Sequence, residues 1–427
     1  MLKHFSYPYG HGFKDFTLDD QQIIQEVTMP AVDPLENPKQ AILDAITHPI
    51  GCPSLLETIK PNDTVTFICN DSTRVANSHI FMPILVNELN KLGVPDENME
   101  IAFATGSHRD MSPEEMEQEV GTEIAHRLKM FNNECNNPDA YEFFGKTSFG
   151  TPVWVHRRIC HRDHVILTGT VVFHYLAGYG GGRKAVVPGM AGMESIRMTH
   201  RHMLDPRSGL GKTKDNPAYK DFEECVGLWA KGRSVFLLNP ILDEHHRFLK
   251  IFAGDYLKAH EAACRYVDTV YGVPIRQKAD IVIASCGGYP KDINVYQMQK
   301  TMDNAMLAAK EGGVVIVLAE CEEGAGNPVL METCRRCGSI DTIEEELRSH
   351  FRVGAHKAYT ITRLMRKAKF ILVTGIDHQI ARDLFFNGCC STVAEAIQLA
   401  VKLNGKDNPQ FILMPAGSLT VPLYKGQ

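Results

Sequence analysis

The chain has 427 residues, which is too long for one ordinary hydrophobic core and predicts two domains. Its 44% hydrophobic and 22% charged residues are typical of a globular protein and exclude a disordered one. The net charge of -6 excludes the basic footprint of a protein that binds nucleic acid or an anionic membrane, so we expect a small-molecule ligand.

The N-terminal segment "MLKHFSYPYGHGF" lacks the apolar core of a signal peptide, and no apolar run approaches the roughly 20 residues of a membrane span. We therefore expect a cytoplasmic protein without a membrane partner, whose twelve cysteines are reduced. Cys334 and Cys337 form one C-x-x-C, but a zinc knuckle needs a second such pair, which the sequence lacks.

Short apolar runs rich in β-branched residues recur along the chain and predict strands. They lie at 64–69, 99–104, 164–169, 234–238, 280–285, 314–318, 370–375 and 411–415. Helical patterns lie between them, among others at 76–93, 195–204, 254–272 and 295–313. This alternation predicts an α/β fold of two domains with largely parallel sheets.

The polar helical pattern at 254–272, followed by a new series of strands, predicts a domain boundary near residues 265–278. We expect an N-terminal α/β domain at 1–270 and a C-terminal α/β domain at 271–410. The last segment, 411–427, is a candidate to return to the N-terminal domain.

Polar segments, three of which contain glycine, follow four of the predicted strands directly. They are "NDSTR" (70–74), "TGSHRD" (105–110), "TVVFHYLAGYGGGRK" (170–184) and "CGGYPKDINVYQMQK" (286–300). Ligands of parallel sheets bind beyond the carboxyl ends of the strands, so these segments can converge on one crevice. Because the fourth segment belongs to the second domain, we expect an interdomain active-site cleft.

The segment "GYGGGRK" suits a compact anion, since glycine-rich turns present backbone N–H groups. It is not a P-loop, because Ala185 follows Lys184 where a hydroxyl residue is needed to bind magnesium. A surface turn with a solvated Arg183–Lys184 pair explains the segment equally well.

His108 and His174 follow two different strands, and histidines facing one carbon can exchange acid and base roles. Each alone is more often structural. His200 and His202 fall on different faces of a helical pattern, so only one of them suits a metal.

Arg74, Lys300 and Tyr296 supply two cations and a phenol that suit a carboxylate, although surface salt bridges also explain isolated cations. Asp71 would orient Arg74 or bond to the ligand.

Taken together, "NDSTR", "TGSHRD", "HYLAGYGGGRKAVVPG", "MTHRH" and "GGYPKDINVYQMQK" resemble, in order and over most of the chain, the motifs of the nickel-dependent lactate racemase family. The resemblance implies a nickel-pincer nucleotide (pyridinium-3,5-bisthiocarboxylic acid mononucleotide nickel). It further implies that Lys184 binds this cofactor covalently, that the preceding glycines let backbone and cofactor approach closely, and that His200 is the protein ligand of nickel.

The same resemblance assigns the remaining candidates. His108 and His174 match the paired acid/base histidines, and the residues that line the substrate pocket are Arg74, Tyr296, Gln297 and Lys300, with Asp71 in support. The implied reaction is racemisation or epimerisation of a 2-hydroxy acid, in which the Cα hydride passes to the cofactor, leaves a 2-keto acid and returns to its other face. Enzymes of cofactor synthesis are implied as cellular partners.

The chain departs from lactate-specific members, in which we expect a tryptophan near the substrate in the second domain. Its two tryptophans, Trp154 and Trp229, lie in the first domain, and the segment 352–364 offers His356 and Tyr359 instead. A larger or more polar substrate is therefore an alternative: malate, an aryl hydroxy acid or a sugar acid. The sequence lacks the dinucleotide-binding fingerprint of a nicotinamide-dependent dehydrogenase, which argues against that class of enzyme. A non-catalytic nucleotide-binding protein would have no need for both His108 and His174.

Overall fold

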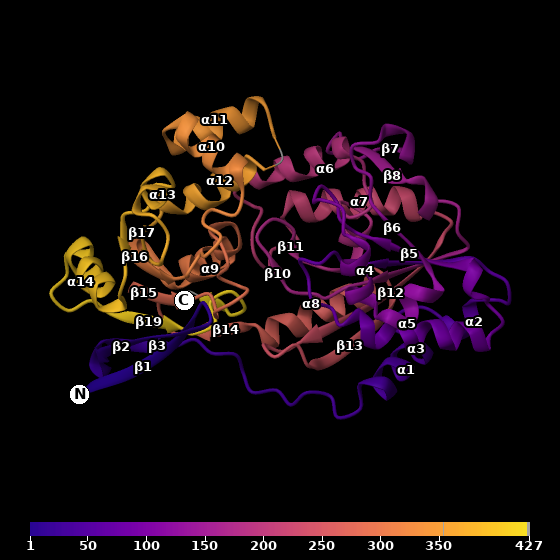
Figure 1. Cartoon of the computed structure of the whole chain (residues 1–427), viewed down its shortest axis with the longest axis horizontal. Coiled ribbons are helices and arrows are strands. Elements are labelled where there is room, and N and C mark those ends of the chain that lie inside the picture. The colour runs from indigo at the N-terminus through magenta and orange to yellow at the C-terminus, as the bar shows by residue number, and fades with distance from the viewer. Residues whose placement is uncertain (353, 425–427) are drawn as a thin grey trace. The chain divides into compact units, whose positions relative to one another are not determined.

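The computed structural model describes residues 1–352 and 354–424, which form two compact units. Unit 2 is Val32–Asp268, and unit 1 combines Met1–Ala31 with the chain from Thr269 on. Residue 353, in the predicted segment 352–364, and residues 425–427 of the predicted tail lie outside the described residues. Each unit is α/β with a large, mainly parallel sheet, which confirms the predicted fold class (Figure 1).

The two ends of the chain belong to a different unit from the one the sequence indicated. Residues 1–31, assigned to the N-terminal domain, belong to unit 1, because β3 (Ile23–Glu26) pairs in parallel with β19 (Phe411–Met414). The described part of the tail stays there too, since β20 (Val421–Tyr424) pairs with β14 (Gly272–Ile275). The expected return of 411–427 to the N-terminal domain is therefore wrong for its described residues.

Unit 2 is built on a sheet in the order β13-β12-β9-β4-β5-β6, in which only the edge strand β13 runs antiparallel. Its strands are β4 (Val65–Cys69), β5 (Met99–Phe103), β6 (Lys129–Asn132), β9 (His164–Thr168), β12 (Ser234–Leu242) and β13 (Phe248–Asp255). Smaller hairpins join β7 (Tyr141–Lys146) to β8 (Pro152–His156), and β10 (Phe173–His174) to β11 (Gly178–Tyr179). Every residue of β4, β5 and β9 is buried, as expected for parallel strands covered on both faces.

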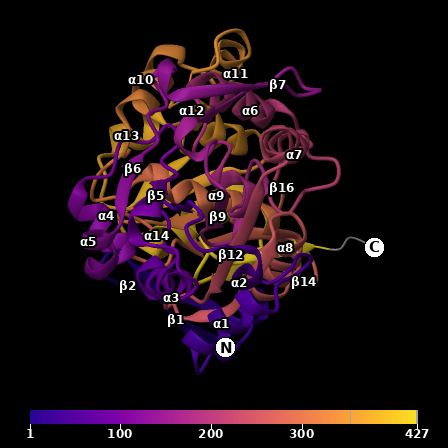
Figure 2. The same cartoon turned by 90° about the vertical axis from the view of Figure 1, so that its right-hand side faces the viewer.

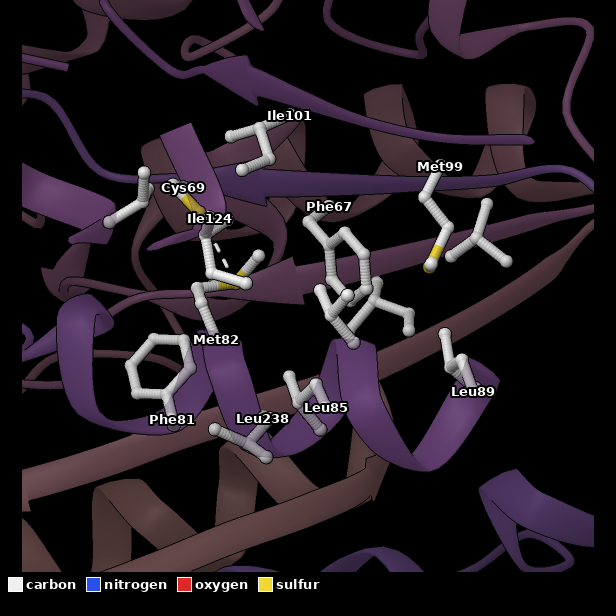
Figure 3. Packing of buried hydrophobic residues seen from close by; sticks show 14 of the residues in the cluster. Phe67, Cys69, Phe81, Met82, Leu85, Leu89, Met99, Ile101, Ile124 and Leu238 are labelled. Carbon is white, nitrogen blue, oxygen red and sulfur yellow. Dashed lines mark hydrogen bonds between the residues drawn. The ribbon is translucent and has the colours of Figure 1, made fainter. Parts of the chain in front are cut away.

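The helices of unit 2 are α1 (Pro38–Thr47), α2 (Leu55–Thr58), α3 (Ser78–Lys91), α4 (Pro113–Val120), α5 (Thr122–Arg127), α6 (Met193–His200), α7 (Pro217–Ala230) and α8 (Lys258–Val270). Helices α3, α4 and α5 lie together in both views (Figures 1 and 2). Figure 3 shows Met82 of α3 pointing at Cys69 of β4, and Leu85 of α3 below Phe67 of β4, in the main core of this unit. This packing fixes where the loops that follow β4 and β5 begin.

Unit 1 is built on the parallel sheet β18-β17-β16-β15-β19-β3. Its other strands are β1 (Leu2–Tyr9), β2 (Gly12–Asp19), β15 (Ala279–Ser285), β16 (Ala309–Leu318), β17 (Lys369–Val373) and β18 (Gly388–Cys390). Its helices are α9 (Val295–Ala308), α10 (Pro328–Cys337), α11 (Ile340–Ser349), α12 (His356–Thr362), α13 (His378–Asp383) and α14 (Val393–Asn404).

The N-terminal hairpin β1-β2 belongs to the hydrophobic core of unit 1. Phe5, Tyr7 and Phe16 form contacting aromatic pairs and pack in one cluster with Ile283 of β15 and Ile316 of β16. Burial of these aromatic rings stabilises the association of the N-terminus with the C-terminal sheet.

All eight predicted strands are present. The helix predicted at 295–313 ends at Ala308, because Ala309 already pairs with Ala279 as the first residue of β16. No helix in the described part of the chain is long and apolar enough to cross a membrane.

Candidate active site

Three of the polar segments follow neighbouring parallel strands of unit 2. Strand β4 lies between β5 and β9, and all three run in the same direction. The segments that begin after Cys69, Phe103 and Thr168 therefore leave the sheet at the same edge. They carry Asp71 and Arg74, then His108, then the run from His174 to Lys184.

Asp71 holds the ring of His108. The carboxylate is 5% exposed, and its Oδ2 contacts Nδ1 of His108 at short range. Its Oδ1 accepts hydrogen bonds from the hydroxyl of Thr73 at 2.6 Å and from the backbone N–H of Thr73 at 3.1 Å. Burial acts to raise the pKa of Asp71, but the hydrogen bonds from His108 and Thr73 outweigh it, so the pKa lies below its usual value.

An ionised Asp71 accepts a proton-bearing Nδ1, so the neutral His108 ring has its lone pair on Nε2. Asp71 thus orients His108 as a carboxylate orients a catalytic base. From the sequence we expected Asp71 to orient Arg74 or bond to the ligand, and its observed partner was not foreseen.

Whereas Nδ1 of His108 donates a hydrogen bond, the ring of His174 is held through an Nδ1 that accepts hydrogen bonds. Its Nδ1 accepts the backbone N–H groups of Leu176 and Ala177, each at 3.2 Å, and its ring stacks on Tyr175 with centroids 4.9 Å apart. An accepting Nδ1 leaves the proton on Nε2. The two predicted acid/base histidines therefore present different forms, His108 with a lone pair on Nε2 and His174 with an Nε2–H group.

Lys184 lies in a 3₁₀ turn, Gly182–Ala185. Its side chain is half-buried, and burial lowers the pKa of its ammonium group well below the usual value, an effect to which the charge of Arg74 adds. A lysine in such surroundings holds more of its amine in the neutral, nucleophilic form than a solvated lysine does.

His200 is the last residue of α6 and is half-buried. Its Nδ1 donates to the carbonyl of Ile196 at 2.8 Å, so the neutral ring has its lone pair on Nε2. Burial lowers the pKa of His200 to about 4; the hydrogen bond to Ile196 opposes this, and the charges of Lys184 and His108 add to it. These electrostatic interactions indicate that Asp71, Arg74, His108, Lys184 and His200 form one cluster in unit 2.

The neighbouring His202 has a structural role. Its Nε2 lies 2.8 Å from Oδ2 of the fully buried Asp221, a carboxylate that also accepts the hydroxyls of Thr147 and Thr151. No group of three or more His, Cys, Asp or Glu side chains in residues 1–352 and 354–424 is arranged to hold a metal ion.

The structure gives a further reason for the glycines before Lys184, which is close packing of the turn against the rest of the protein. Gly181 and Gly182 have φ values of +67° and +58°, which favour glycine. A Cβ on Gly181 would lie 2.8 Å from the carbonyl oxygen of Thr170, and one on Gly182 would lie 2.5 Å from the ring of His260. These two glycines are thus required because the turn packs against the protein itself, whereas we expected them to allow close approach of a cofactor.

Tyr296, Gln297 and Lys300 lie in unit 1, in the first two turns of α9. Asn294 caps this helix by accepting the Gln297 N–H at 3.0 Å, and Nζ of Lys300 donates to Oε1 of Gln297 at 3.0 Å. The helix follows β15, so these side chains also lie beyond the carboxyl end of a parallel strand.

Lys357 is a buried cation beside this group that the sequence analysis missed. It is 7% exposed, its Nζ lies 4.3 Å from the ring centroid of Tyr296, and it donates to Oε1 of Gln299 at 2.8 Å. Lysine is among the most exposed residue types, so sequence alone gave no reason to place it inside the unit.

The fold and these groups define an α/β protein with a cluster of ionisable side chains beyond the carboxyl ends of its parallel strands. Family models of the lactate racemase N-terminal domain and the lactate racemase C-terminal domain match residues 9–211 and 275–421. The chain belongs to the lactate racemase family and is therefore an enzyme of the isomerase class.

Relatives match over most of the chain. A lactate racemase of Thermoanaerobacterium thermosaccharolyticum is 27% identical over 416 residues, which are 95% of this chain and 96% of that protein. A lactate racemase of Lactiplantibacillus plantarum is 31% identical over 290 residues, 67% of each chain.

Two solved structures share the fold. The lactate racemase apoprotein from T. thermosaccharolyticum matches with a TM-score of 0.91 and 26% identity, over 99% of this chain and 100% of that one. A Thermotoga maritima protein with 21% identity has a TM-score of 0.69 over 93% of this chain and 100% of its own.

Proposed function

We propose that this enzyme racemises or epimerises a 2-hydroxy acid by hydride transfer to a nickel-pincer nucleotide bound covalently at Lys184. The observation that carries the proposal is the cluster in unit 2. A lysine of lowered pKa, a histidine held neutral and a carboxylate–histidine pair interact electrostatically beyond the carboxyl ends of the strands. We further propose that the protein works in the cytoplasm, where enzymes of cofactor synthesis load it.

The residues of the cluster suit such a cofactor. A metal-binding histidine usually donates one ring N–H to a carbonyl or carboxylate and offers the other nitrogen to the metal, which is the form of His200. Imidazole is a suitable ligand of nickel. Lys184 would hold the nucleotide covalently, and the burial that lowers its pKa increases the uncharged fraction of the amine that such an attachment needs.

A nucleotide held at Lys184 would supply the acceptor for the Cα hydrogen and its electron pair. The chain's own residues move the remaining proton. His108, oriented by Asp71, accepts the hydroxyl proton at Nε2, and the charged carboxylate stabilises the imidazolium that results. His174, whose proton is on Nε2, would give that proton to the keto oxygen as the hydride returns to the other face of Cα, and the two histidines would exchange roles in the opposite direction.

Arg74 of unit 2 and Lys300 of unit 1 would hold the substrate carboxylate, with Tyr296 and Gln297 beside it. The guanidinium group suits bidentate contact with a carboxylate, and an ammonium group adds a point charge. Orientation of the reacting carbon by these contacts is the main contribution of the protein, since the cofactor supplies the redox chemistry.

Lys357 favours a second candidate substrate class within this reaction, a 2-hydroxy acid with a second carboxylate, such as malate. Lys357 already interacts with Gln299 and with the charge of the buried Asp303, and a second substrate carboxylate that reached past Tyr296 would add a contact with this cation that a monocarboxylate would not make. Lys357→Met should therefore lower kcat/KM for malate more than for lactate. Equal losses for both acids would contradict the dicarboxylate alternative.

The test of the main proposal is turnover of single-enantiomer 2-hydroxy acids by cofactor-loaded protein in heavy water. Hydride transfer keeps the original hydrogen on Cα, because a hydrogen that travels as hydride does not exchange with solvent. Removal of the Cα hydrogen as a proton would instead introduce deuterium there. Extensive deuterium at Cα during turnover by the wild-type enzyme would refute the hydride mechanism.

A further inference from the structure

We propose that His260 is a positioning residue for Lys184, holding the turn Gly180–Lys184 through the Gly180 carbonyl so that the lysine amine points into the cluster of Arg74 and His200. This inference rests on the proposed function of Lys184.

Two buried side chains of unit 2 form hydrogen bonds with the backbone of the turn. Oδ1 of Asn239 in β12 accepts the N–H of Gly182 at 2.8 Å, and Nε2 of His260 in α8 donates to the carbonyl of Gly180 at 2.8 Å. Asn239 is 0% exposed and His260 is 2% exposed, so neither bond competes with water. Hydrogen bonds at both ends of a glycine pair restrict the freedom that glycine otherwise gives the backbone.

The His260 ring also limits the turn sterically. The position of a Cβ on Gly182 would lie 2.5 Å from Cδ2 and 2.7 Å from Cγ of that ring. The imidazole therefore lies directly against the backbone of Gly182 while it donates to Gly180. His260 thus restrains the turn both by a hydrogen bond to Gly180 and by direct contact with the backbone of Gly182.

Arg183 fixes the direction in which Lys184 points. Its guanidinium lies 3.9 Å from the ring centroid of Tyr219 in α7, is 2% exposed, and is 3.7 Å from the carboxylate of Glu223. Successive residues of a 3₁₀ turn point about 120° apart. With Arg183 held against α7, the side chain of Lys184 leaves the turn in another direction, and the groups with which it interacts electrostatically include Arg74, His200 and His260.

The His260 ring stays neutral, with its Nε2–H group bonded to Gly180, over the pH range in which the enzyme would work. Burial lowers the pKa of His260 to about 3, and the charge of Arg183 adds to this. A neutral ring with Nε2–H bonded to Gly180 suits a fixed structural donor, because it does not change its charge as pH varies between about 5 and 9.

The experiment compares His260→Leu with His260→Gln in the full-length protein without cofactor. A glutamine amide reaches the position of Nε2 and restores the N–H donor, whereas leucine fills space without it. Val267→Ala, a buried truncation two turns along α8, serves as the matched control for loss of helix packing.

The measurement is competitive labelling of lysines with trace acetic anhydride across a pH series, read at Lys184 by peptide mass spectrometry against the exposed Lys231. We expect His260→Leu to raise the apparent pKa of Lys184 toward the usual value of a lysine. We expect His260→Gln and Val267→Ala to leave it near the wild-type value. The fraction of Lys184 that acquires the cofactor mass in cells should fall in His260→Leu and stay near the wild-type value in His260→Gln and Val267→Ala.

Two results would overturn the inference. One is a folded His260→Leu protein that labels at Lys184 as the wild type does. The other is an equal change in His260→Leu and His260→Gln, which would indicate a packing role alone. Because the labelling needs neither cofactor nor substrate, this inference can fail while loaded wild-type protein still racemises 2-hydroxy acids. Conversely, loaded protein that racemises none of them would refute the proposed function without changing the labelling result.

Discussion

Replacing Glu119 by glutamine should stabilise unit 2 at alkaline pH and have little effect at acidic pH. Glu119 lies in α4, and its Oε1 accepts the hydroxyl of the buried Ser78 at 2.6 Å. Burial raises the pKa of Glu119 from 4.5 to about 7, opposed by the hydrogen bond from Ser78 and reinforced by the charge of Asp71. The folded unit therefore binds this proton more tightly than the unfolded chain does.

The magnitude follows from the difference between the folded and unfolded pKa values. The stabilisation by the proton is fully present below the unfolded value of 4.5 and is lost as pH rises to about 7. Each pKa unit corresponds to about 1.4 kcal/mol, so ionised Glu119 should reduce the free energy of unfolding by about 3 kcal/mol above pH ~8. Glutamine accepts the same Ser78 bond and carries no charge, so it avoids this loss.

The assay is thermal unfolding at about pH 5 and about pH 8.5, together with hydrogen exchange of the α3 and β4 amides, which reports on unit 2 alone. At about 2–4 °C per kcal/mol, Glu119→Gln should raise Tm by about 6–12 °C at the higher pH and by much less at the lower. Glu117→Gln on the same helix is the control. A gap between variant and wild type that does not change with pH would refute the reasoning.

Other substitutions test the proposed roles directly. Lys184→Ala should lack the covalent adduct that intact mass detects in wild type made with the cofactor-synthesis enzymes; equal added mass in both would contradict attachment there. His200→Ala should keep the adduct but lose nickel in metal analysis. Asp71→Asn should lower kcat by about 10²–10⁴-fold with an unchanged circular dichroism spectrum, because the ring it holds would lose its preferred tautomer. Arg74→Ala and Lys300→Ala should each reduce kcat/KM by the equivalent of about 2–5 kcal/mol, and a loss in only one of them would place the carboxylate within a single unit.

The site was only partly predictable. The positions of Asp71, His108 and Lys184 after strands 64–69, 99–104 and 164–169 followed from sequence, since parallel strands direct their following loops to one edge. The contact of Asp71 with His108 was not predictable, because it joins two loops whose conformations no local pattern specifies. His260 and Lys357 were missed for a related reason: their importance lies in burial against other elements, and composition does not report it.

The sequence by itself determined the local structure of this protein. Runs of β-branched residues such as Val65–Cys69 form buried strands, and capping residues such as Asn294 begin helices at the expected places, because both depend on neighbouring residues. Only the tertiary structure decided that the N-terminal strand Ile23–Glu26 completes the C-terminal sheet beside Phe411–Met414. It likewise decided that Gly182 must be glycine because the ring of His260 occupies the adjacent space. Both depend on which distant surfaces meet when the chain buries its apolar area, and that selection is made by the whole fold.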